Sequence, residues 1–200
     1  MLRPIRKLLV TPARRLLRAG SLRRFARAQE GATAVEFGLV AAPFLALLFA
    51  ILETALVFFA GQALETAAAD SGRYIMTGQA QAAGYTSVSD FKSNVLCPML
   101  GTNSLFNCAD VQVDVETYTD FSAINTAPPV KDGKLDTADM NYNAGGAGDI
   151  VVVRLYYKWP IYLSLLNDSL SNLSGGYRLL VATSVFRNEP FGSNSSSSGS

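Results

Sequence analysis

An almost uncharged stretch near the N-terminus constrains this chain more than any other feature. There is no charged residue between Phe37 and Leu52, and residues 54–64 are again uncharged. A bilayer core of ~30 Å is crossed by roughly 20 helical residues, and the stretch from Ala32 to about Phe58 is long enough for that. The sequence therefore predicts a single membrane-spanning helix.

Charge is distributed unevenly on the two sides of this stretch. The net charge of the chain is +1, but residues 1–30 carry nine basic side chains against one acid, Glu30. The remainder has eight basic and fifteen acidic residues, a net charge of −7. The positive-inside rule then predicts a cytoplasmic N-terminus and an exported C-terminal part. A basic leader could also bind nucleic acid through phosphate contacts, but its position beside an apolar stretch favours the membrane, and we expect no nucleic-acid partner.

A cleaved secretory signal is a less favoured alternative for the same stretch. Its apolar part is longer than the ~7–15 residues of a signal-peptide core, and Glu53 lies near the end of that part. The helical pattern also continues through the small residues at 60–63. We therefore expect a single-pass anchor with its N-terminus inside.

Two cysteines, Cys97 and Cys108, are present, and the chain has no histidine. A structural zinc site needs about four Cys or His ligands, so these residues predict no metal site. If the acidic part is exported, a disulfide between them is favoured, and it would stabilise the fold by ~2–3 kcal/mol. Two unpaired buried thiols are the alternative.

Two glutamates and a proline interrupt the apolar stretch. A carboxylate inside hydrocarbon is costly, which makes Glu36 a candidate functional residue; the alternative is that it lies among the lipid headgroups. Glu53 is expected at the opposite interface. Pro43 lacks a backbone donor and is expected to bend the helix near Leu39.

The residues around Glu36 resemble the processing site of type IV-type prepilins. The sequence Gly31-Ala32-Thr33-Ala34-Val35-Glu36-Phe37 follows the basic leader, and Glu36 is the fifth residue after Gly31. The resemblance implies that a prepilin peptidase cuts between Gly31 and Ala32. It also implies that Glu36 pairs with the terminal amine of a neighbouring subunit inside a filament, where either charge alone would be costly to bury.

The downstream residues are similar to the TadE-like family of minor pilins, or pseudopilins, from the tight adherence (Tad/Flp) pilus system. Residues 44–53 match that family's apolar stretch ending in Glu, and residues 62–74 resemble its alanine-rich helix. One departure is Asp70-Ser71, where the family often has an Arg-Glu pair. The end of the chain, 182–190, also resembles the family. The resemblance implies that the helix packs in an assembly through Glu36, Phe37, Pro43 and Glu53.

Beyond the membrane, periodicity predicts one further helical stretch and three strands. The first helix should continue to about Gly78 and bury one face of small and apolar residues against a sheet. That face contains Leu64, Ala67, Ala68, Ser71 and Ile75. A short helix is expected at 87–96 with Ser87 or Ser89 as its cap. Strands are expected at 111–118, 150–159 and 177–186, forming an antiparallel meander.

The predicted fold class is therefore α+β, with a long N-terminal transmembrane helix continuing into a periplasmic, pilin-like antiparallel β-sheet domain. Residues 1–31 would be the leader, 32–78 the helix, 79–190 the sheet domain and 191–200 a flexible Ser/Gly tail.

The polar residues of this domain are weaker candidates for binding a partner or a metal ion. The loop at 125–148 is longer than most connections and is expected to be a surface excursion or a partner-binding loop. Calcium ligation is disfavoured because the spacing misses the EF-hand pattern; the candidate ligands would be Asp132, Asp136, Asp139 and Asp149. On the first strand, Asp114 and Glu116 share the polar face and are expected to be solvated.

No nucleophile–base pair can be assembled without histidine, so we expect neither an enzyme nor a cofactor.

The expected function is that of a minor pilin that primes, caps or enters a Tad-type adhesion pilus. Its expected partners are the prepilin peptidase, other pilins, Tad inner-membrane assembly proteins and the lipid bilayer. It would be an inner-membrane protein that also reaches the extracellular pilus if it is incorporated. The alternative is an uncleaved, membrane-anchored periplasmic scaffold or binding protein of a secretion or pilus machine. A major pilin is disfavoured because Flp-type major subunits are far shorter.

Overall fold

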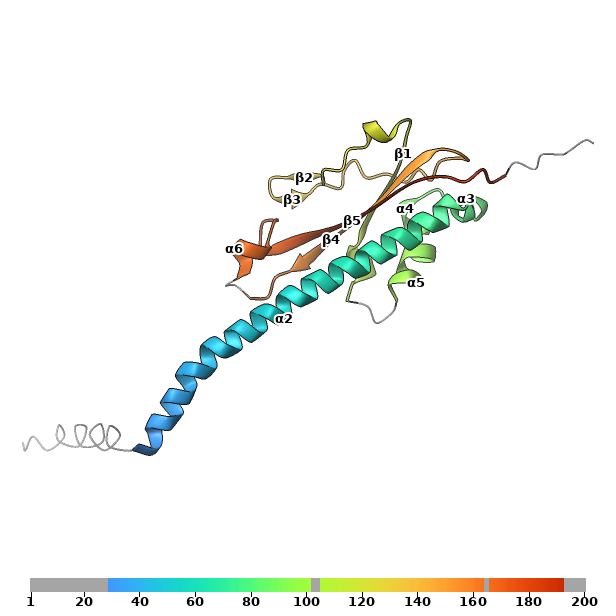
Figure 1. Cartoon of the computed structure of the whole chain (residues 1–200). Coiled ribbons are helices and arrows are strands. Elements are labelled where there is room, and N and C mark those ends of the chain that lie inside the picture. The colour runs from blue at the N-terminus through green and yellow to red at the C-terminus, as the bar shows by residue number, and fades with distance from the viewer. Residues whose placement is uncertain (1–28, 102–104, 164–165, 193–200) are drawn as a thin grey trace, which may run out of the picture. The chain divides into compact units, whose positions relative to one another are not determined.

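The computed structural model describes residues 29–101, 105–163 and 166–192 (Figure 1). The chain divides into two compact units, residues 1–48 and 49–200. A single helix, α2 (Gln29–Met76), provides residues to both units. Its length and composition make it a candidate membrane span, with a mean hydropathy of 2.3 in its most apolar window. A long apolar N-terminal helix was predicted, and it is confirmed.

The helix ends at Met76, slightly before the expected Gly78. The N–H of Gly78 donates to the carbonyl of Ile75 at 2.9 Å, which closes the last turn. Gly78 has a φ of 78°, a left-handed conformation that glycine adopts at little cost. It is followed by the short helix α3 (Gln79–Ala82).

Three antiparallel strands form the main sheet, in the order β1–β4–β5. They are β1 (Gln112–Tyr118), β4 (Ile150–Pro160) and β5 (Tyr177–Arg187). All three predicted strands are confirmed, and their sequential order makes the sheet a meander. The register pairs Val113 with Leu155 and Leu155 with Ala182, which brings apolar side chains to one face.

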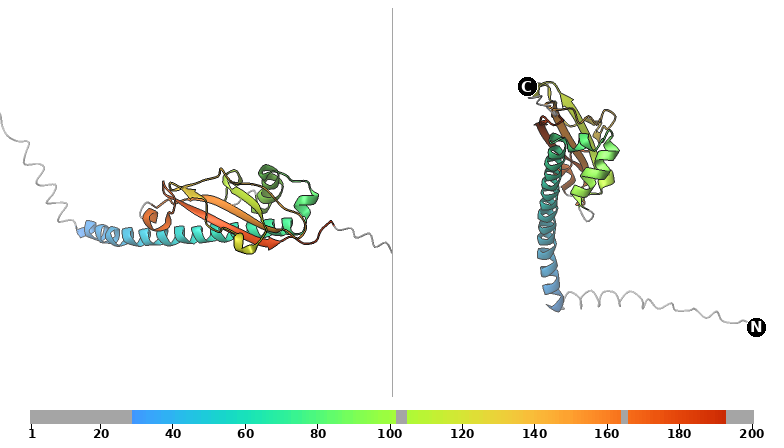
Figure 2. Two further views of the ribbon diagram at one scale, coloured as in Figure 1. Left: turned by 90° about the horizontal axis from the view of Figure 1, so that it is seen from above. Right: turned by 90° about the vertical axis from the view of Figure 1, so that its right-hand side faces the viewer.

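The helical residues beyond Leu48 cover this apolar face, as both views in Figure 2 show. The predicted face of α2 is buried: Leu64, Ala67, Ala68, Ser71 and Ile75. A Cβ added at Gly72 would lie 2.6 Å from Ser184 Oγ and 2.8 Å from a ring carbon of Phe186. Gly72 therefore allows the close approach of α2 to β5.

The predicted short helix is a composite of three turns. They are α4 (Val88–Phe91), a π-helical turn η1 (Lys92–Leu96) and α5 (Cys97–Leu100). Ser87 is the cap, and its hydroxyl accepts the N–H of Asp90 at 3.1 Å. Phe91 and Val95 are buried in the core.

The opposite face of the sheet is covered by the segment between β1 and β4. This segment contains the 3-10 turn η3 (Phe121–Ala123) and a small hairpin of β2 (Val130–Lys131) with β3 (Lys134–Leu135). Leu135 and Met140 pack against a second buried cluster of Tyr156, Leu173 and Leu179. The long polar loop is thus part of the folded domain. The remaining short elements are η2 (Cys108–Asp110) before β1 and α6 (Asn167–Leu170) before β5.

Candidate functional site

Four of the residues predicted to act in processing and assembly lie on the exposed surface of α2: Gly31, Glu36, Phe37 and Pro43. Gly31 is in the first helical turns, and its neighbour Ala32 is also helical. Glu36 and Pro43 are exposed, and Phe37 is 75% exposed. The chain does not use these side chains in its own core, so their surface remains accessible to lipid or to another subunit.

The apolar surface of α2 ends where the sheet domain begins. Between Thr33 and Leu52 the side chains are largely exposed, and the first buried one is Glu53. This interval is roughly 20 residues, or ~30 Å at 1.5 Å per residue, which equals the thickness of a bilayer core. Packing on the sheet thus starts at Glu53 and Val57, earlier than the predicted face that begins at Leu64.

Glu53 is only 6% exposed and is bonded within the chain. Its carboxylate accepts the backbone N–H of Tyr162, and its Oε2 accepts the N–H of Leu163 at 3.0 Å. These amides follow the end of β4, where the ladder no longer provides partners. Two backbone amides that donate to one side chain make a strong attachment. Glu53 therefore fixes the start of the β4–β5 connection to α2, while a role in packing between subunits stays a prediction.

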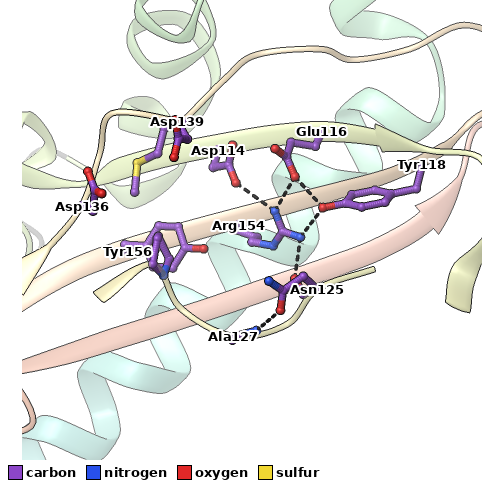
Figure 3. A pocket seen from close by; sticks show the side chains of 11 residues that line it. Asp114, Glu116, Tyr118, Asn125, Ala127, Asp136, Asp139, Arg154 and Tyr156 are labelled. Atoms are coloured by element: carbon purple, nitrogen blue, oxygen red, sulfur yellow. Dashed lines mark hydrogen bonds and ion pairs between the residues drawn. The ribbon is translucent and has the colours of Figure 1, made fainter. Parts of the chain in front are cut away.

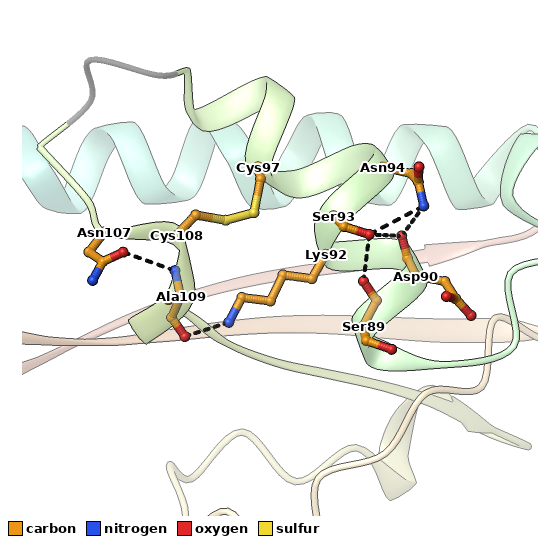
Figure 4. Close-up of a disulfide and its surroundings, with 9 residues drawn as sticks. All are labelled: Ser89, Asp90, Lys92, Ser93, Asn94, Cys97, Asn107, Cys108 and Ala109. Atoms are coloured by element: carbon orange, nitrogen blue, oxygen red, sulfur yellow. Dashed lines mark hydrogen bonds between the residues drawn. A yellow bond between two sulfur atoms is a disulfide. The ribbon is translucent and has the colours of Figure 1, made fainter.

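The two cysteines form a disulfide, as predicted, with their Cα atoms 5.6 Å apart (Figure 4). The bond joins the end of the short helical region to η2. Beside it, Lys92 Nζ donates to the carbonyl of Ala109 at 2.7 Å and links the same two segments. Phe106, inside the closed loop, packs edge-on against Tyr157 with ring centroids 5.0 Å apart. The disulfide thus closes the loop from which Phe106 packs against the sheet.

A buried arginine occupies the outer face of the sheet, where solvated acids were predicted (Figure 3). Arg154 is 6% exposed, and its Nη1 donates to Asp114 and Glu116, both at 2.9 Å. Its Nη2 donates to the Tyr118 hydroxyl at 2.8 Å and to the carbonyl of Asn125 at 2.7 Å. Asp114 is buried as well. The prediction of a solvated acidic face was therefore wrong, because the segment after β1 covers it.

These contacts change the titration of the groups involved. Burial opposes the charge of Arg154, but hydrogen bonds to Tyr118, Glu116 and Asp114 outweigh it and raise the pKa of the guanidinium. Burial also opposes the charge of Glu116, yet hydrogen bonds from Tyr118 and Arg154 lower its pKa. Arg154 and Glu116 therefore remain ionised together near neutral pH. Burial raises the pKa of Tyr156 on the same face to about 12, so its hydroxyl keeps its proton.

A pocket of about 290 Å³ lies over this network. Its walls come from β1, from β4 and from the segment between them. The residues that line it are Asp114, Glu116, Tyr118, Asn125, Ala127, Pro129, Asp136, Asp139, Met140, Arg154 and Tyr156. Within the described ranges, no group of three or more Cys, Asp or Glu side chains is placed to hold a metal ion. The weak calcium candidates among the aspartates do not converge.

Comparison with known proteins identifies the N-terminal part of the chain. The family model described as TadE-like protein matches residues 31–73. This segment is TadE-like. It begins at Gly31 and includes most of α2. No curated protein and no solved structure matches the chain.

The TadE-like segment contains every residue predicted for processing and assembly, from Gly31 to Glu53. The disulfide, the Arg154 network and the resemblance at 182–190 lie outside it. Sequence analysis missed Arg154, although one signal pointed to it. A single basic residue in the middle of an apolar central strand must be paired or exposed.

Proposed function

We propose that this chain is a minor pilin, or pseudopilin, of a Tad/Flp-type pilus. A prepilin peptidase would cut it after Gly31, and the mature chain would prime, cap or enter the filament. The observation that carries this proposal is the position of the family match, which starts at Gly31 immediately after the basic leader. Cleavage there would leave Ala32 as a new cationic N-terminus, with Glu36 one helical turn away.

The exposed surface of α2 supports an assembly role. The side chains of Glu36, Phe37 and Pro43 are exposed and do not pack in the chain's own core. The exposed apolar residues around them would be buried by lipid or by other helices. In a filament, Glu36 would neutralise the terminal amine of a neighbouring subunit. The partners are then other pilins, the inner-membrane assembly proteins and the bilayer.

The proposed topology places the N-terminus in the cytoplasm and the sheet domain in the periplasm. The basic leader supports the cytoplasmic side. The Cys97–Cys108 disulfide supports an oxidising compartment for the sheet domain. We propose no catalytic activity or cofactor for this domain.

One observation favours an uncleaved anchor as the second candidate. The helix α2 starts at Gln29, so the bond after Gly31 lies within the first helical turn. A peptidase needs an accessible, locally opened chain, which a helical turn does not present. In that case the protein would be a membrane-anchored scaffold, and its leader would only set the topology.

The assembly role can be tested with Glu36→Ala in cells that make the Tad pilus. We expect processing to stay largely intact, while incorporation and filament yield fall. Glu65→Ala is the matched control, because Glu65 is an exposed glutamate of the same TadE-like segment. Equal filament yield from Glu36→Ala and the wild type would contradict the proposed role.

A further inference from the structure

The exposed apolar surface of α2 continues beyond Glu53, where packing on the sheet begins. Leu56, Phe58 and Phe59 are 47%, 70% and 63% exposed, and the next charged residue of the helix is Glu65. Phe58 and Phe59 follow Glu53 by five and six residues, or ~8 Å along the helix axis. The headgroup layer on each side of a bilayer core is roughly 5–8 Å thick. Because the residues before Glu53 already fill the bilayer core, these side chains would reach across the headgroup layer.

The start of the β4–β5 connection is bonded to the same part of the helix. The carboxylate of Glu53 accepts the backbone N–H groups of Tyr162 and Leu163. The side chain of Tyr162 is nevertheless 78% exposed. A tyrosine ring has an apolar body and a polar hydroxyl, and membrane proteins place such rings at the level of the headgroups. Tyr162 is thus an exposed aromatic residue held at the end of the candidate membrane span.

The two ends of the sheet expose different side chains. Tyr162 follows Pro160, the last residue of β4, and Tyr177 pairs with Pro160 and is 42% exposed. The connection itself, residues 161–176, contains a single charged residue, Asp168. Three exposed acids flank the strands at the other end: Asp120, Asp149 and Glu189. The end that is bonded to Glu53 therefore suits a lipid surface better than the acidic end does.

These two ends are well separated. In Figure 1, α6 of the connection and α3 lie toward opposite ends of the sheet. The central strand β4 has 11 residues, so its ends are ~33 Å apart. A bilayer that contacts the Tyr162 end would therefore leave the acidic end in water.

We propose that the sheet domain rests on the bilayer through the start of the β4–β5 connection. Tyr162 enters the headgroup layer, as do Phe58 and Phe59 of α2. The partner is the lipid surface, because these residues extend the exposed apolar surface of the candidate span without interruption. This contact depends on the proposed topology, in which α2 spans the membrane. It adds a second membrane contact, which orients the sheet with its acidic end away from the lipid.

The test is quenching of tryptophan fluorescence by brominated lipids. The full chain would be reconstituted into vesicles of phosphatidylcholine and phosphatidylglycerol, with bromine on the phosphatidylcholine acyl chains near either the headgroup end or the methyl end. Trp159→Phe removes the native tryptophan and keeps an aromatic ring against Phe106 and Tyr157. In that background, Tyr162→Trp places a single reporter in the connection. It should lose most of its fluorescence to bromine near the headgroup end, and much less to bromine near the methyl end.

Two further reporters make the result specific. Phe121→Trp is the matched control, because Phe121 is 57% exposed and follows β1 at the acidic end of the sheet. Its fluorescence should be the same in brominated and unbrominated vesicles. Phe44→Trp reports on the span, since Phe44 is 60% exposed and lies in the uncharged stretch. It should be quenched most by bromine near the methyl end.

The same three substitutions would also be made with Trp159 retained. Subtracting the wild-type signal then gives the quenching of each added tryptophan, so the test does not depend on Trp159→Phe being tolerated by the fold.

The proposal would be overturned if Tyr162→Trp kept its fluorescence while Phe44→Trp was quenched. The span would then stand, and another subunit or water would cover Tyr162. Equal quenching of Tyr162→Trp and Phe121→Trp would also overturn it, because the contact would not belong to one end of the sheet. If Phe44→Trp kept its fluorescence as well, the proposed topology would fail together with the lipid contact.

Discussion

Replacing Arg154 by methionine should destabilise the sheet domain strongly. The guanidinium makes four hydrogen bonds, to Asp114, Glu116, Tyr118 and the carbonyl of Asn125. The side chains of Arg154 and Asp114 are 7% and 9% exposed, so Arg154→Met leaves a buried carboxylate without its counter-charge. Removing one partner of a buried ion pair typically lowers the free energy of unfolding by ~3–5 kcal/mol. For a domain of this size, that lowers the melting temperature by on the order of 10 °C.

The chain contains a built-in probe for this measurement. Trp159 is the only tryptophan and is buried on β4, the strand that also contains Arg154, so its fluorescence follows unfolding of the sheet domain. Thermal or urea unfolding would be compared for the wild type, Arg154→Met and the double variant Arg154→Met/Asp114→Leu. Removing both charges should recover much of the loss, because the carboxylate that then remains, Glu116, is 35% exposed and can be solvated.

Lys131→Met is the matched control, since the Lys131–Asp136 ion pair lies on the surface with the lysine 71% exposed. This substitution should leave the midpoint of unfolding unchanged. The account of the outer face would be refuted if Arg154→Met unfolded at the same temperature as the control variant. It would also be refuted if the second substitution, Asp114→Leu, lowered the free energy of unfolding by as much again as Arg154→Met does alone.

Three other perturbations should have distinct effects. Glu53→Ala leaves the amides of Tyr162 and Leu163 without their acceptor, so it should lower the free energy of unfolding by ~1–3 kcal/mol. Hydrogen exchange at those two amides should become faster in Glu53→Ala and stay unchanged in the control Glu65→Ala. Replacing both cysteines by serine should lower the free energy of unfolding by about 2–3 kcal/mol, and reduction of the wild type should reproduce that loss. Because the folded-state pKa of Glu116 is lowered, its stabilisation is present above the ordinary carboxyl pKa of about 4.3 and is lost as the pH falls through the lower folded value. Acid titrations followed by Trp159 fluorescence should therefore show a shallower loss of stability in Glu116→Gln; an unchanged slope would contradict the assigned pairing.

Elements that depend on local patterns could be predicted from the sequence. The uncharged stretch gave α2, and alternating or β-branched runs gave β1, β4 and β5 close to their observed ends. The helix expected at 87–96 is the instructive exception. Pro98 cannot donate to the carbonyl of Asn94, and the chain widens into the π turn η1 just before it.

Features that depend on distant partners could not be predicted. Glu53 was expected at a membrane interface, but its bonding partner Tyr162 is 109 residues away. Arg154 and Asp114 meet only because of the pairing register of β1 with β4. The covering of the outer face also depends on single long-range bonds, such as the N–H of Asn141 donating to Asp114 at 3.0 Å. Hydropathy and periodicity contain no information on such pairs.

The central proposal is that this chain, whose residues 31–73 match the TadE-like family model, is processed after Gly31 and acts in pilus assembly. Its most direct test is the intact mass of the protein purified from membranes of cells with and without the prepilin peptidase. We predict a peptidase-dependent product that begins at Ala32, and only the full-length chain when the peptidase is absent. A full-length chain in both strains would contradict the claim and leave the membrane-anchored scaffold as the function of this protein.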